Sequence, residues 1–118
     1  MKYLCLIYDD ETTLYALPKH DMERLIKDHL AFDRDLAQSG YLLGTNALER
    51  VSAATTVRVR QGKVWATDGP FAETKEQLGG YYLIEARDLN EAIQVAARIP
   101  SARRGSVEVR PVREHFEA

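Results

Sequence analysis

The hydrophobic pattern of the chain begins with a strand. Apolar and aromatic residues fill most positions of residues 2–8, and acidic residues follow at once. A short and nearly continuous apolar run of this kind predicts a central strand that is covered on at least one face. Residues 81–86, with sequence YYLIEA, predict a second strong strand.

The longest periodic segment predicts an amphipathic helix over residues 18–39. Its apolar positions recur at steps of three and four, which places them on one face. Pro18 suits the first helical turn, and Gly40 suits the left-handed residue that ends a helix. The expected inner face consists of Met22, Leu25, Ile26, His29, Phe32 and Leu36.

The second half of the chain predicts a hairpin, a shorter helix and a last strand. Residues 55–60 alternate in the strand period, residues 63–67 follow, and Gln61-Gly62 forms a two-residue turn. Asp88 is the expected cap of a helix that ends at Pro100, with Glu91 completing a capping box. Two further extended segments are expected, at residues 41–51 and 107–112.

This order predicts an α+β fold: a ferredoxin-like sandwich with an antiparallel sheet and two helices on one face. Helices on one side leave the other sheet face without cover. Residues 3–8 and 81–84 are apolar or aromatic at consecutive positions, so both faces of the sheet are apolar. A second copy of the chain is the expected cover, which predicts a homodimer.

Composition narrows the class of protein. The 118 residues fit a single domain, residues 1–118, and the net charge is −2. Cys5 is the only cysteine, which excludes an intrachain disulfide scaffold and a zinc site made of several cysteines. The sequence shows no clustered basic excess, no membrane-length apolar run and no signal peptide. We therefore expect a cytoplasmic protein that binds neither nucleic acid nor membrane.

Two residues are candidates for chemistry. His29 lies on the apolar face of the predicted helix, where an imidazole can serve as a general acid or base, or as a hydrogen-bonded core residue. Asp68 precedes Gly69, and it can bond its own turn or orient a nearby histidine. The other histidines, His20 and His115, are expected in solvent.

Other features have two interpretations each. The acidic run at residues 9–11 can be a solvated loop or a set of ligands for a hard cation. Cys5, within a strand, is expected to be a small apolar core residue. Phe71, Tyr81 and Tyr82 can line a pocket or pack in the core. No dinucleotide or phosphate-binding motif and no metal-ligand spacing is present, so no cofactor and no metal are expected.

Residues 67–85, with sequence TDGPFAETKEQLGGYYLIE, resemble the DGPF-domain proteins of the YCII-related family. The similarity covers nearly the whole chain and implies a dimeric α/β barrel. It also implies a site built on a histidine and an aspartate, carried here by His29 and Asp68. Relatives have an Asp-Pro-aromatic motif near the last strand, where this chain has Ile-Pro-Ser at residues 99–101.

These observations lead to two hypotheses. The first is a homodimeric enzyme acting on a small-molecule ligand by lyase or isomerase chemistry. His29 is its acid/base, Asp68 orients His29, and Phe71, Tyr81 and Tyr82 shape the pocket. The alternative is a non-catalytic binding or regulatory module, because the resemblance extends to proteins associated with extracytoplasmic-function sigma factors.

Overall fold

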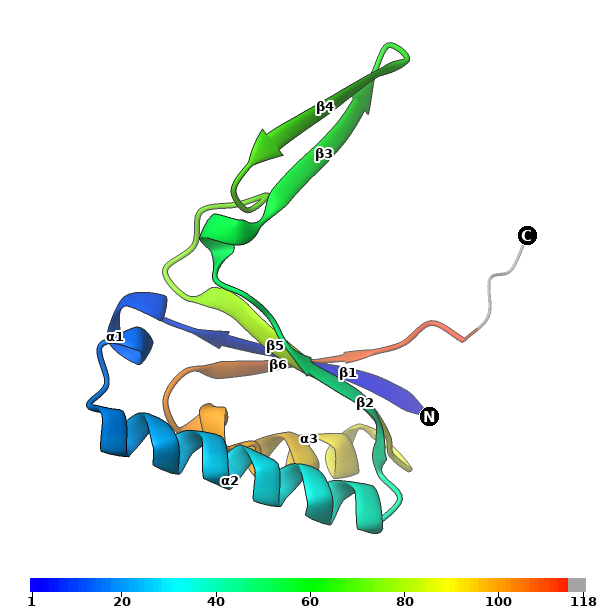
Figure 1. The fold of residues 1–118 in the computed structure, drawn as a ribbon. Coiled ribbons are helices and arrows are strands. Elements are labelled where there is room, and N and C mark those ends of the chain that lie inside the picture. The colour runs from blue at the N-terminus through cyan, green and yellow to red at the C-terminus, as the bar shows by residue number, and fades with distance from the viewer. Residues whose placement is uncertain (115–118) are drawn as a thin grey trace.

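The fold consists of one four-stranded sheet, a layer of helices and a separate hairpin (Figure 1). The computed structural model describes residues 1–114, so His115 lies outside the described part. The elements are β1 (Lys2–Asp9), α1 (Glu11–Tyr15), α2 (Lys19–Gln38), β2 (Leu42–Ala47), η1 (Val51–Ala53), β3 (Thr55–Arg60), β4 (Lys63–Asp68), β5 (Gln77–Glu85), α3 (Leu89–Ala97), η2 (Pro100–Arg103) and β6 (Ser106–Pro111).

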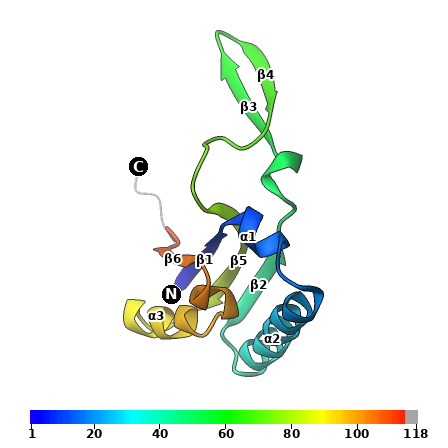
Figure 2. The same cartoon turned by 90° about the vertical axis from the view of Figure 1, so that its left-hand side faces the viewer.

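The sheet confirms the predicted fold class. Its strand order is β2-β5-β1-β6, and every neighbouring pair is antiparallel. Helices α2 and α3 both lie on one face of this sheet, as the two views show (Figures 1 and 2). This is the ferredoxin-like arrangement, consistent with one subunit of a dimeric α/β barrel. Among residues 1–114, no helix is long and apolar enough to span a bilayer.

Alternation along the strands divides the sheet into a core face and an open face. In β1, Tyr3, Cys5 and Ile7 are buried with the helices, whereas the residues between them are half-exposed. Cys5 is fully buried, and burial raises the pKa of its thiol to about 11, as expected for an inert core residue. The register places Leu4, Leu6, Tyr8, Tyr81 and Leu83 on the open face.

Helix α2 begins and ends within one residue of the prediction. Pro18 is its N-cap, and Gly40 has a φ of +82° just beyond its last turn. The predicted inner face is too wide, however, because Ile26 is 53% exposed. Only the second half of the helix reaches the core, where Phe32 and Leu36 are buried.

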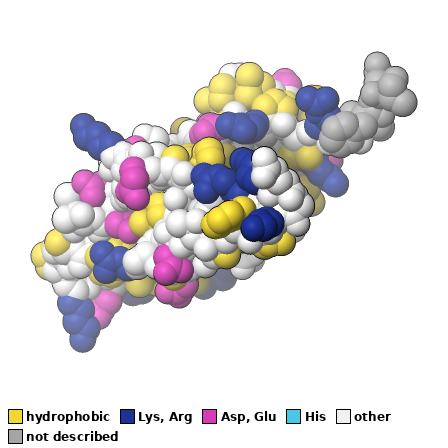
Figure 3. Space-filling view, turned by 90° about the horizontal axis from the view of Figure 1, so that it is seen from above, with side chains coloured by type: hydrophobic (Ala, Val, Ile, Leu, Met, Phe, Trp, Pro, Cys, Tyr) yellow, Lys and Arg dark blue, Asp and Glu magenta, His cyan; other side chains and the backbone are white. Residues whose placement is uncertain are grey.

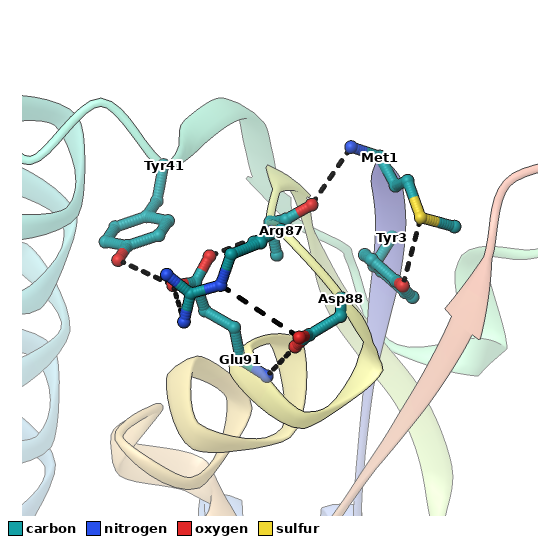
Figure 4. Close-up of polar contacts among 7 residues, drawn as sticks. Met1, Tyr3, Tyr41, Arg87, Asp88 and Glu91 are labelled. Atoms are coloured by element: carbon teal, nitrogen blue, oxygen red, sulfur yellow. Dashed lines mark hydrogen bonds and ion pairs between the residues drawn. The ribbon is translucent and has the colours of Figure 1, made fainter.

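Helix α3 starts at a network of side-chain caps (Figure 4). The carboxylate of Asp88 accepts a hydrogen bond from the backbone N–H of Glu91 at 2.9 Å, as predicted. The Glu91 carboxylate accepts from the N–H of Arg87 at 2.8 Å rather than from that of Asp88. The cap is thus a capping box displaced by one residue.

The acidic run at residues 9–11, which starts at the last residue of β1, is not a solvated loop, and this corrects one of its two interpretations. Asp9 is buried and pairs with Arg104 at 2.9 Å, and the Asp10 carboxylate caps α1. The Glu11 carboxylate accepts from the backbone N–H of Val51. The three carboxylates therefore serve three different structural contacts.

Candidate functional site

His29 lies between α2 and two segments from the second half of the chain. Its Nδ1 is 3.1 Å from the hydroxyl of Tyr82 on β5, and its Nε2 is 2.7 Å from Oγ of Ser101 in η2. Tyr82 and Ser101 are buried, whereas His29 is half-buried in the wall of the core. The imidazole is therefore fixed by a hydrogen bond at each ring nitrogen.

The hydrogen bonds around His29 form a chain in which each group donates to the next, from Ser101 to Asp33. The Tyr82 hydroxyl donates its proton to the Asp33 carboxylate, so its oxygen is left to accept from Nδ1–H of His29. Nε2 is then unprotonated and accepts from the hydroxyl of Ser101. The chain Ser101–His29–Tyr82–Asp33, named here the His29 relay, assigns a single neutral tautomer to the imidazole.

Burial sets the protonation states along the His29 relay. Desolvation lowers the pKa of His29, and the charge of Arg103 acts in the same direction, against opposing effects of Asp33 and Asp28. Desolvation also raises the pKa of Tyr82, and its hydrogen bond to Asp33 adds to this effect. The relay thus joins a neutral imidazole and a neutral phenol near pH 7.

The relay is braced by ring packing and by the chain on either side of Ser101. The rings of His29 and Tyr82 are nearly parallel, 12° apart, and Phe32 packs edge-on against Tyr82. The turn that carries Ser101 ends at Gly105, whose N–H donates to the Ser101 carbonyl at 2.9 Å. The ion pair between Arg104 and Asp9 ties this turn to β1.

The residues expected at the site are not all together. Tyr82 does contact His29, but Asp68 is an exposed residue at the end of β4, in the hairpin on the side of the sheet opposite α2 (Figure 1). Phe71 is 80% exposed beneath Arg58. Tyr81 is on the open face, where its hydroxyl accepts from Asn46. The carboxylate that joins the relay is that of Asp33, which accepts from the Tyr82 hydroxyl.

Sequence reasoning missed Asp33 and Ser101. Asp33 follows His29 by four residues, a spacing that places both side chains on the same face of a helix. Ser101 stands in the segment where relatives have Asp-Pro-aromatic, and its contact with His29 depends on how η2 folds back onto α2. The helical spacing could have indicated Asp33, whereas no local signal indicated Ser101.

The lowered pKa of His29 predicts a loss of stability in acid. An imidazole in the unfolded chain takes up a proton near pH 6.5, whereas the folded chain resists protonation to lower pH. The unfolded state therefore binds more protons below pH 6.5, and the free energy of unfolding falls from pH 7.5 to 5.5. Urea denaturation should show a smaller fall in a His29→Gln variant. An unchanged slope would contradict this account, and a His20→Gln variant is the exposed-histidine control.

The protein is an α+β sandwich whose helix α2 carries a half-buried histidine relay, and comparisons with known proteins identify its family. A family model for the YCII-related domain matches residues 1–115. A Rhizobium meliloti (strain 1021) protein described as uncharacterized is 41% identical over 114 residues, which cover 95% of this chain and 92% of that protein. The chain belongs to the YCII-related family.

Proposed function

We propose that the chain is a small-molecule enzyme in which His29 serves as general base and general acid. The observation that carries this proposal is the His29 relay. It keeps Nε2 unprotonated, with its lone pair facing the Ser101 hydroxyl, and it directs Nδ1–H toward Tyr82 and the Asp33 carboxylate. The charge of Asp33 favours the imidazolium that forms when Nε2 takes a proton, against the larger opposing effect of desolvation.

The proposed chemistry is proton transfer at carbon or oxygen of an activated substrate, as in isomerisation or elimination. Nε2 of His29 removes a proton, and the electron pair stays on the substrate. In an isomerisation the same nitrogen returns the proton to a different atom. In an elimination the electron pair forms a double bond and the leaving group departs with its own bonding pair. The Ser101 hydroxyl donates to Nε2 in the free protein, so the substrate must displace this hydrogen bond before Nε2 takes its proton. Asp33 takes the orienting role first expected of Asp68.

A homodimer is part of this proposal. The open face presents Leu4, Leu6, Tyr8, Tyr81 and Leu83, and no helix within residues 1–114 covers them. An apolar sheet face of this kind fits a second copy of the same face about a two-fold axis. Sedimentation equilibrium should give twice the 13.4 kDa chain mass, and a monomer at all concentrations would contradict it.

A screen for exchange of solvent deuterium tests the proposed chemistry. Metabolites that stabilise the protein in thermal shift are incubated with it in D₂O, and proton NMR follows deuterium incorporation. A ligand at 100 times its dissociation constant adds about 2.7 kcal/mol of stability, which such a screen detects. We expect at least one ligand with catalysed exchange that slows in acid as His29 becomes protonated. If every ligand found binds without catalysed deuterium exchange, the proposed enzymatic function is wrong.

A second candidate function is a regulatory module that binds an extracytoplasmic-function sigma factor. Ile26 and Leu30, one turn apart on α2, are each 53% exposed and offer an apolar contact for a partner. Co-expression with such a sigma factor from the same genome should give a complex that Ile26→Ser with Leu30→Ser weakens. An unchanged complex would exclude this surface, and no complex at all would remove this candidate.

A further inference from the structure

The hairpin of β3 and β4, residues 55–68, leaves the rest of the chain and extends into solvent on the open-face side of the sheet (Figures 1 and 2). Every residue of β4 is exposed, and Val57, Val59 and Val64 are each more than half exposed. A two-stranded ribbon by itself is only marginally stable in water. The hairpin therefore needs a surface to pack against.

The register gives the hairpin one aliphatic face and one basic face. Val57 pairs with Ala66 and Val59 with Val64, so these side chains share one side of the ribbon. The other side carries Arg58, Arg60, Lys63 and Trp65. Figure 3, viewed from the side toward which the hairpin extends, shows hydrophobic patches bordered by Lys and Arg side chains.

The base of the hairpin gives it a defined direction. The N–H of Gly69 donates to the carbonyl of Ala54 at 2.8 Å, and the hydroxyl of Thr56 donates to the Gly69 carbonyl at 2.9 Å. Gly69 has a φ of +103°, a conformation that suits glycine and closes the base. At the tip, Gln61 and Gly62 have positive φ values of 53° and 76°, as the predicted two-residue turn requires.

We infer that the hairpin is an arm that packs against the body of a second copy of this chain. Strands of six residues reach about 20 Å, whereas two packed sheets lie only about 10 Å apart. In a dimer that joins the open faces, an arm on that side must extend alongside the partner and past its sheet. The inference rests on the proposed homodimer and names which segment holds it together.

The distribution of charge also favours a second copy of this chain as the surface against which the hairpin packs. The hairpin carries Arg58, Arg60 and Lys63 against Asp68, a net charge of +2, so the rest of the chain carries −4 within the total of −2. A basic arm and an acidic body on one chain are complementary between two copies. In a dimer with a two-fold axis, the hairpin of each subunit packs against the body of the other. Both hairpins are then covered, and the assembly closes at two subunits.

Paired substitutions on two surfaces test the arm. Val59→Ser with Val64→Ser removes aliphatic contact from the hairpin, and Leu89→Ser with Ile93→Ser is the matched control on α3, where the side chains are 48% and 49% exposed. Sedimentation should show the dimer dissociation constant at least tenfold higher in the hairpin variant and near wild type in the control. Equal dissociation constants in both variants and the wild type would overturn the inference that the hairpin packs against the partner.

Photocrosslinking distinguishes the arm from the dimer itself. A Val64→p-benzoylphenylalanine chain mixed with an isotope-labelled copy should give crosslinked peptides that join the two copies. The same crosslinker placed at Ile26, on the exposed side of α2, should give no crosslinked peptides that join the two copies. If the wild type is a dimer but the Val64→p-benzoylphenylalanine chain gives no intermolecular crosslinks, the inference about the hairpin is wrong and the open-face dimer stands. A wild-type monomer would overturn both.

Discussion

A His29→Asn variant is expected to lose solvent deuterium exchange by about 10²- to 10⁴-fold, the contribution that a positioned general base makes. Asparagine can still hydrogen-bond to Tyr82 or Ser101, but it has no group that takes up a proton near neutral pH. Ligand binding should therefore change far less than the rate. NMR exchange rates at saturating ligand, beside thermal shifts for affinity, measure the two effects separately.

The same helix supplies the control for this variant. His20 is exposed at the start of α2, so His20→Asn changes the same residue type without touching the His29 relay. It should exchange deuterium at the wild-type rate. If His29→Asn loses stability but keeps the exchange rate, His29 is a structural core residue and the proposed enzyme is wrong.

A Gly105→Ala variant is expected to lose about 3 kcal/mol or more of unfolding free energy. A Cβ at this position would lie 2.0 Å from the backbone oxygen of Tyr8 and 3.1 Å from Cα of Asp9. Both obstacles are backbone atoms of β1, which pairs with β6 at this point, so no side-chain rotation relieves the clash. Either the start of β6 or the end of β1 must shift.

Gly79→Ala is the matched control, because a methyl group at Gly79 would have no atom beyond its chain neighbours within 4 Å, and the φ of Gly79 is not positive. Urea denaturation should show that variant within about 1 kcal/mol of wild type. If Gly105→Ala does not fold, its soluble yield beside that of Gly79→Ala supplies the comparison. Equal stability of the two variants would contradict the close approach of Gly105 to β1.

The fold followed from the sequence because its patterns are local. The apolar run of β1, the period of α2 and the turn at Gln61-Gly62 each depend on neighbouring residues, and the structure contains all three. The error at Ile26 has a tertiary cause: the helical period shows which face is apolar but not how much of the helix the sheet reaches. The direction in which the hairpin leaves the sheet also depends on tertiary structure, so local sequence patterns do not predict it.

The site was predictable only in part. His29 stood out because an imidazole interrupts an apolar face, and Tyr82 came from a group of aromatic residues. Their partners Asp33 and Ser101 come from α2 and η2, so the full set requires the packing of three elements. The sequence pairs Asp68 with His29 both as a carboxylate before a turn and by the resemblance, whereas the structure places Asp68 in the hairpin on the opposite side of the sheet. Its role in function stays a prediction.

The most direct test of the His29 relay is nitrogen-15 NMR of the His29 ring as a function of pH. We expect a proton on Nδ1, none on Nε2 at pH 7, and a pKa of the His29 ring below the ordinary 6.5. In a Tyr82→Phe variant the preference for the Nδ1–H form should weaken, because its acceptor is gone. A proton on Nε2, or a pKa at or above 6.5 in the wild type, would contradict the relay and the general base built on it.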